Sequence, residues 1–120
     1  WVHNPANGYC YFFEDRGGTW FEGREFCFEV GADLATVHSA EEDAFIFDML
    51  TEFVWLGLND LETEGVYTNF SDGTPADFEN FPADNYQNED HDCVSMRHLE
   101  LYDRYWFFLE CNFTAASLCK

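Results

Sequence analysis

The side chains best suited to acid–base chemistry in this chain are its four histidines, His3, His38, His91 and His98. Histidine exchanges a proton near neutral pH, and in enzymes it commonly activates a Ser, Cys or Thr nucleophile. Here no histidine has a nucleophile at a recognisable spacing, and the chain carries neither a Gly-rich phosphate loop nor a Ser/His/Asp signature. A loop histidine among carboxylates, such as His91, is more often solvated than catalytic. We therefore predict that the protein is not an enzyme.

Cysteine chemistry is the second possibility, and it is represented by Cys10, Cys27, Cys93, Cys111 and Cys119. None of them forms a CxxC pair, and no His/Cys cluster has the spacing of a structural zinc site. In a small, loop-rich domain such cysteines indicate disulfides formed in an oxidising compartment.

Two N-glycosylation sequons agree with that compartment, at Asn69-Phe70-Ser71 and Asn112-Phe113-Thr114. Such sequons occur often by chance, so their weight comes from their combination with the cysteines. The chain opens Trp1-Val2-His3 without a basic segment or an initiator Met, which is typical of a processed mature chain or a trimmed fragment. No run approaches the ~18 apolar residues of a membrane span. We expect a secreted, extracellular glycoprotein that does not insert into a membrane.

The net charge of the chain limits the classes of partner that it is expected to bind. Five basic residues face 24 acidic ones, giving a formal net charge of −19. A polyanion repels nucleic acid and anionic membranes, so neither is an expected partner. A cationic partner, a calcium-rich setting or a mineral surface would suit this charge, and so would a simple need for solubility.

The elements that must position these residues can be predicted from periodicity and capping signals. Residues 9–14 indicate a strand, followed by a turn at Gly17-Gly18. Thr19 then caps a first helix, which Gly31 ends.

A second helix follows at the capping box of Ser39 and Glu42, and it runs to about Thr51. The apolar run 53–58 indicates a buried strand. Residues 59–92 are polar, acidic and rich in turn residues, which is typical of a long functional loop.

Three short strands close the chain, and they are predicted at 93–96, 105–110 and 116–120. At 120 residues, with 47% hydrophobic and 20% aromatic content, the whole chain 1–120 is expected to form one domain. The order of its elements predicts the α+β class.

The aromatic group near the end of the chain is the candidate contact surface, and it comprises Tyr102, Tyr105, Trp106, Phe107 and Phe108. Strand alternation places Trp106 and Phe108 on one face and Tyr105 and Phe107 on the other. One face should be core. The other is either an exposed apolar patch that contacts a ligand or a second subunit, or it merely fills space.

Motifs spread over nearly all of the chain resemble those of the C-type lectin-like domain family. The most specific are Trp55-Leu56-Gly57-Leu58 and the four later cysteines in their order. Further matches are Tyr9-Cys10-Tyr11, Trp20, residues 31–39, Glu41-Glu42, residues 71–75 and Trp106. The resemblance implies two helices flanking small antiparallel sheets, with a long irregular loop.

The resemblance also implies the disulfide pairs Cys27–Cys119 and Cys93–Cys111. Cys10 is then left over. It is a candidate for an interchain disulfide that makes a homo- or hetero-oligomer. The alternatives are a free or capped thiol, and the partner of a cysteine further upstream.

The family's sugar site depends on one calcium ion, held by a Glu-Pro-Asn or Gln-Pro-Asp triplet and by an Asn-Asp pair after the tryptophan. In this chain Phe107 and Phe108 replace the pair, and no such triplet occurs. Asp84 and Asn85 are at best remnants of the triplet, and the acidic ligand further along falls on His91. Calcium needs six to eight oxygen ligands. The resemblance therefore implies that calcium-bridged sugar binding has been lost.

The family has two auxiliary calcium positions, and this chain keeps the carboxylates of only one of them. Asp60, Glu64 and Asp92, with Asp90, match one of them and would hold a single structural calcium, although an ordinary acidic loop would look the same. At the other position a lysine, Lys120, stands in place of a carboxylate near Glu42, which predicts a salt bridge between the two, weak if exposed.

Taken together, the sequence predicts a binding module that recognises an extracellular glycan or protein without the usual calcium bridge. The alternative is an acidic, self-assembling protein of a matrix or a mineral surface. Ice binding, known for some members of the fold, is a further alternative.

Overall fold

The protein is described by a computed structural model that covers residues 1–61, 67, 70–82, 91–97 and 104–120. The helices are α1 (Trp20–Glu29) and α2 (Ala40–Met49). The strands are β1 (Val2–His3), β2 (Cys10–Gly18), β3 (Val54–Asn59), β4 (Cys93–Arg97), β5 (Tyr105–Leu109) and β6 (Ala115–Cys119). The predicted α+β class is confirmed, and β1 is a strand that the sequence did not predict.

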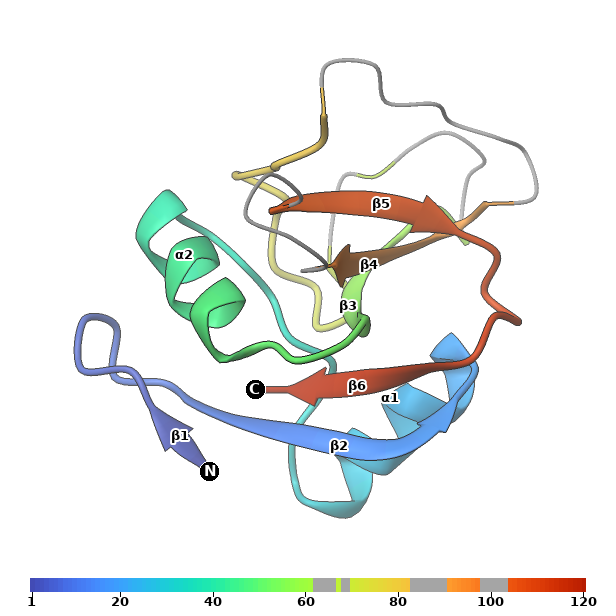
Figure 1. Ribbon diagram of the computed structural model, residues 1–120, viewed down its shortest axis with the longest axis horizontal. Helices are drawn as coiled ribbons and strands as arrows, with labels where there is room; N and C mark the ends of the chain where they lie inside the picture. Colours follow the sequence, from blue (N-terminus) through green and yellow to red (C-terminus); the bar gives the residue numbers. More distant parts are fainter. Residues whose placement is uncertain (62–66, 68–69, 83–90, 98–103) are drawn as a thin grey trace.

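The described strands pair in the order β1-β2-β6-β3-β4-β5, and Figure 1 shows β6 lying along β2. Neighbours are antiparallel except for β3 and β6, which run parallel with Val54 opposite Ala116. The expectation of purely antiparallel sheets was therefore wrong. The reason is that β6 inserts between two earlier strands, β2 and β3. It runs antiparallel to β2 and parallel to β3.

The first helix begins as predicted, but the turn before it does not form. The Thr19 hydroxyl accepts a hydrogen bond from the Glu22 amide, and the Glu22 carboxylate accepts one from the Thr19 amide, which completes a capping box. The predicted turn at Gly17-Gly18 is instead part of β2. Gly17 has a φ of 71°, and the strand register shifts between Glu14 and Gly18. A glycine at positive φ is typical of a β-bulge, which bends a strand without ending it.

The second helix begins at its predicted cap, Ser39, but its capping box is incomplete. The Ser39 hydroxyl accepts a hydrogen bond from the Glu42 amide, as expected of a cap. The Glu42 carboxylate, however, accepts from the His38 amide at 2.8 Å instead of the Ser39 amide. The capping box is only half formed, because the carboxylate is also needed elsewhere. The helix ends at Met49, two residues before the predicted Thr51.

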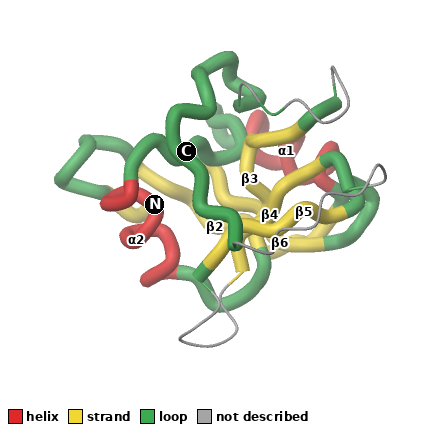
Figure 2. Tube along the Cα trace, turned by 90° about the horizontal axis from the view of Figure 1, so that it is seen from above, coloured by secondary structure: helices red, strands yellow, loops and turns green. Residues whose placement is uncertain are grey.

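Each helix covers its own part of the core, and Figure 2 shows strands between the two helices. Ile46 and Phe47 of α2 pack into the larger apolar cluster with Leu56 and Trp106. α1 contributes Trp20 and Cys27 to a second cluster, which also contains Trp55, Cys93 and Cys119.

Both predicted disulfides are confirmed. Cys27–Cys119 joins α1 to β6 across 92 residues of sequence, and Cys93–Cys111 joins β4 to the residue that follows the end of β5 by two positions. Cys10 is exposed and unpaired in this chain. None of the described helices is long and apolar enough to cross a membrane.

Candidate functional site

An aromatic cluster lies against one face of β5, where the resemblance places the sugar-ligating pair. The Phe108 ring stacks on the Phe81 ring with centroids 4.4 Å apart, and the Tyr67 ring lies 4.7 Å from it. Phe81 and Phe78 both meet Trp106 edge-on, at 5.7 and 5.8 Å. Phe108 is 9% exposed and Trp106 is fully buried. We call these five residues the aromatic cluster.

Trp106 is fastened to α2 by a buried polar contact. Its indole Nε1–H donates to Asp43 Oδ1 at 2.7 Å, and Asn80 Nδ2 donates to Asp43 Oδ2 at 2.8 Å. The Trp106 backbone amide also donates to the Asn80 carbonyl at 2.9 Å, which pairs the 78–82 segment with β5. Burial raises the pKa of Asp43, although the bonds from Trp106 and Asn80 oppose the shift. The cluster is thus held from both α2 and the loop.

The two faces of β5 follow the predicted alternation. Trp106 and Phe108 are buried, Tyr105 is 38% exposed, and Phe107 is half-buried. The two open interpretations of the aromatic group therefore apply to different residues: Phe108 fills space in the core, and Tyr105 is accessible to a ligand. Tyr102 lies outside the described residues.

Part of the predicted auxiliary calcium set is brought together. The Asp60 amide donates to the Asp92 carbonyl at 3.0 Å, so the two residues adjoin, and Asp60 is buried. Glu64 and Asp90 lie outside the described residues, as do Asp84, Asn85 and the sequon residue Asn69. Within the described ranges no three His, Cys, Asp or Glu side chains gather as a metal site. The auxiliary calcium stays a prediction that depends on Glu64 and Asp90.

His91, the substitution expected at the sugar site, contributes its backbone to this region. Its carbonyl accepts a hydrogen bond from the Tyr67 hydroxyl at 3.0 Å. Tyr67 thereby connects the aromatic cluster to the segment that leads into β4.

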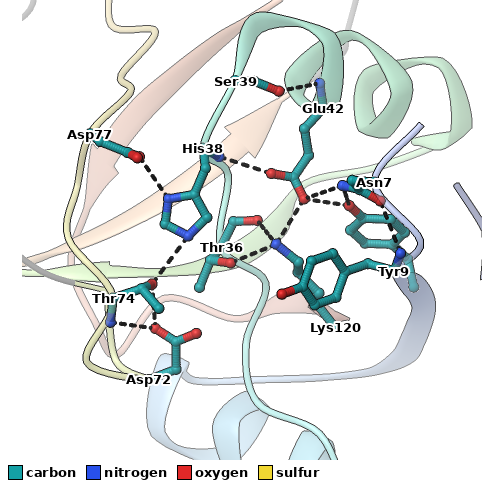
Figure 3. Close-up of polar contacts among 11 residues, drawn as sticks. Asn7, Tyr9, Thr36, His38, Ser39, Glu42, Asp72, Thr74, Asp77 and Lys120 are labelled. Atoms are coloured by element: carbon teal, nitrogen blue, oxygen red, sulfur yellow. Dashed lines mark hydrogen bonds and ion pairs between the residues drawn. The ribbon is translucent and has the colours of Figure 1, made fainter. Parts of the chain in front are cut away.

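The salt bridge predicted between Lys120 and Glu42 is confirmed, and Figure 3 shows its surroundings. The ammonium lies 2.8 Å from Glu42 Oε2 and donates to the Thr36 hydroxyl and carbonyl at 2.8 and 3.2 Å. The Tyr9 ring lies 4.2 Å from the ammonium. The sequence allowed for an exposed and therefore weak pair, but both charged side chains are more than nine-tenths buried.

Glu42 collects further donors, which explains why it stays charged. Its carboxylate accepts hydrogen bonds from the Tyr11 hydroxyl, the Asn7 amide and the His38 backbone. Burial by itself would raise the pKa of Glu42, but the bonds from Lys120 and Tyr11 outweigh it and hold this pKa below its usual range. Burial and the carboxylate together raise the pKa of Tyr11.

A second polar chain, not foreseen from the sequence, brings a histidine to a hydroxyl and two carboxylates. His38 Nδ1 lies 2.7 Å from Asp77 Oδ1, and His38 Nε2 lies 3.1 Å from Thr74 Oγ1 (Figure 3). Thr74 Oγ1 in turn donates to Asp72 Oδ1 at 2.6 Å. The three partners stand 34 or more residues from His38 in sequence, so no local motif could reveal them.

The direction of these bonds distinguishes the chain from a hydrolytic triad. A carboxylate only accepts, so the Thr74 hydroxyl proton belongs to Asp72 and Oγ1 presents a lone pair to His38. A catalytic histidine must accept the proton of its nucleophile. Here the Thr74 hydroxyl donates to Asp72 and not to His38, and the arrangement ties the 72–77 loop to the segment before α2.

Comparisons with known proteins agree with the fold. The Lectin C-type domain family model matches residues 16–120. The chain is 37% identical over 127 aligned residues to an alpha-N-acetylgalactosamine-specific lectin of Patiria pectinifera, covering 95% of this chain and 74% of that lectin. It is 31% identical to human C-type mannose receptor 2, covering 97% of this chain but only 8% of the receptor's length.

Among solved structures, a calcium-independent type II antifreeze protein superposes with a TM-score of 0.82 at 30% identity, covering 92% of this chain and 83% of the other. The chain belongs to the C-type lectin domain family. Its relatives include lectins and antifreeze proteins, which are binding proteins and not enzymes.

Proposed function

We propose that this domain is a secreted binding module that recognises a glycan or protein without the calcium-bridged sugar contact, and that it has no catalytic activity. The observation that carries the proposal is the stack of Phe108 on Phe81. A ring lies where the family resemblance expects a ligating oxygen, and a phenyl ring offers calcium no lone pair.

The contact surface proposed for the ligand starts from the open face of β5. Tyr105 is 38% exposed and Phe107 half-buried, and an aromatic ring can pack on a sugar face or on an apolar protein side chain without a metal. Asp84 and Asn85 are proposed to lie on the same surface, although they are outside the described residues. The lectin relative supports a glycan as the ligand.

A glycan array, run with and without a chelator, tests this proposal. Binding should survive the chelator, and Tyr105→Ala should weaken it. Phe28→Ala is the matched control, since Phe28 is an exposed aromatic on α1. Strong binding that the chelator abolishes would contradict the proposal, because it would require an intact sugar-ligating calcium.

Ice binding is a second candidate, favoured by the similarity to a calcium-independent type II antifreeze protein. That relationship fits a chain in which the sugar-ligating residues have been replaced. Thermal hysteresis and ice-crystal shape in the purified protein test it: faceted crystals in the presence of chelator would support ice binding, and unshaped ice would exclude it.

The remaining alternative is an acidic, self-assembling extracellular protein. The net charge of −19 and the exposed Cys10 on the edge hairpin β1–β2 favour it. Covalent or concentration-dependent assembly without glycan binding would support this alternative over a lectin function.

A further inference from the structure

A cleft lies beside the start of α1 and the β5–β6 connection. These two segments are close together in Figure 1. Its volume is about 390 Å³, and it is lined by Phe21, Leu61, Asp92, Glu110, Cys111 and Asn112. The lining therefore combines two apolar side chains, Phe21 and Leu61, with polar and acidic groups. The cleft contains the asparagine of a sequon.

Both apolar side chains of this lining are exposed. Phe21 is 48% exposed and Leu61 is 43% exposed. The Phe21 ring meets the buried Trp20 ring edge-on, with centroids 5.4 Å apart.

Backbone hydrogen bonds hold the segment that carries Asn112. The Trp20 amide donates to the Cys111 carbonyl at 2.9 Å, which joins the first residue of α1 to the connection. The Phe113 amide donates to the Glu110 carbonyl at 3.0 Å, so residues 110–113 form a turn with Asn112 at its third position. Asn112 and Thr114 are both exposed, as a glycosylating enzyme requires of a sequon.

We propose that Asn112 is N-glycosylated and that the first N-acetylhexosamine of this glycan packs in the cleft against Phe21. A pyranose ring has a face of C–H groups that fits an aromatic ring, while its hydroxyl and acetamido groups can bond to an acceptor such as the exposed Glu110. The glycan would cover the Phe21 ring. The class of ligand is the sugar attached to this chain itself.

The modification needs a lipid-linked oligosaccharyl diphosphate as co-reactant and a transferase of the secretory pathway. A bond forms between Asn112 Nδ2 and the anomeric carbon of the sugar, and the bond from that carbon to the diphosphate oxygen breaks. The diphosphate leaves with the electron pair, and the amide nitrogen gives one proton to the enzyme's base. The inference thus rests on the secretory location proposed above.

Occupancy is tested by expressing the chain in secreting eukaryotic cells and by peptide mass spectrometry before and after enzymatic deglycosylation. The peptide with Asn112 should carry a glycan, and Thr114→Ala should abolish it while Thr114→Ser retains it. An unmodified Asn112 in protein recovered from the medium would overturn the inference and leave the secretory location intact.

The packing of the sugar against Phe21 is tested on protein whose glycan has been trimmed to its first residue. We expect the acetyl methyl resonance to be shifted upfield by the Phe21 ring, and complete deglycosylation to lower the melting temperature by about 3–6 °C. Phe21→Ala should retain occupancy and lose both effects, whereas Phe28→Ala should retain both. An unshifted methyl, or an equal loss of melting temperature in wild type and Phe21→Ala, would overturn the packing against Phe21.

Discussion

The ammonium of Lys120 lies 2.8 Å from the carboxylate of Glu42, and both side chains are more than nine-tenths buried. The pair joins the residue after β6 to the first turn of α2. The same carboxylate binds the Tyr11 hydroxyl and the His38 amide, so one buried charge connects β2, α2 and the end of the chain. A lysine thus supplies the positive charge at a position where the family resemblance expects a cation.

Lys120→Met should destabilise the protein strongly, because it leaves Glu42 charged and buried without its partner. Removal of one member of such a pair costs about 3–5 kcal/mol. Arg104→Met is the control, since its pair with Asp48 is exposed and should contribute about 0–1 kcal/mol. Urea unfolding of both variants measures the difference, and equal losses would contradict the role assigned to Lys120.

The pH dependence of stability should follow Glu42. Its pKa is lower in the folded state, so its contribution is fully present above the unfolded value of about 4.3 and is lost as the pH falls through the folded pKa. Asp77, whose pKa is lowered by its bond to His38, acts in the same direction. Asp43 acts oppositely, because its raised pKa makes stability fall as pH rises above about 3.9.

Urea midpoints compared at neutral pH and near pH 3 check this prediction. Glu42→Gln should show a smaller loss between the two conditions than the wild type. An identical pH profile in the variant would remove Glu42 from the explanation.

Phe107 and Phe108 should differ in their contribution to stability although they are neighbours. Phe108→Ala opens a cavity beside Phe81 and should cost about 3–5 kcal/mol. Phe107→Ala removes a half-buried ring and should cost about 1–2 kcal/mol. Denaturant unfolding of the two variants compares them, and a larger loss for Phe107→Ala would show that the aromatic cluster does not fill the core.

Gly23→Ala should destabilise α1, against the usual preference of helices for alanine. A Cβ at this position would lie 2.2 Å from Ser117 Oγ of β6 and 3.4 Å from the Trp55 ring. The overpacking cost of about 1–3 kcal/mol exceeds the helix propensity gain of at most about 1 kcal/mol. Thermal unfolding measures the loss, and adding Ser117→Ala should recover part of it; a double variant no better than Gly23→Ala would place the clash elsewhere.

Cys10 should crosslink two chains when the protein is purified under oxidising conditions. The thiol is exposed on β2 opposite His3, next to the exposed side chains of Val2 and Tyr9. Gel mobility with and without reductant measures this, with Cys10→Ser as the control that should remain monomeric. A wild-type monomer in both lanes would exclude the interchain disulfide.

Much of the fold could be predicted from the sequence because its signals are local or strongly patterned. Thr19 and Ser39 mark helix starts through side-chain oxygens that accept from amides three residues on. The apolar run at Trp55 identifies a buried strand, and the family resemblance implies both bridges. The bulge at Gly17 was missed because two adjacent glycines fit a turn as well as a strand with a register shift.

The candidate sites, too, could be predicted only in part from the sequence. The sequence by itself determined what is absent from the sugar-ligating positions, since phenylalanine has no oxygen in any conformation. The family resemblance also implied the pairing of Lys120 with Glu42, since a lysine stands where the family has a carboxylate. Only the tertiary structure decided that this pair is buried, that Phe108 stacks on Phe81 while Tyr105 stays exposed, and that His38 meets Thr74 and Asp77. These features depend on solvent exposure and on contacts between distant residues, which chain folding sets and residue identity alone does not.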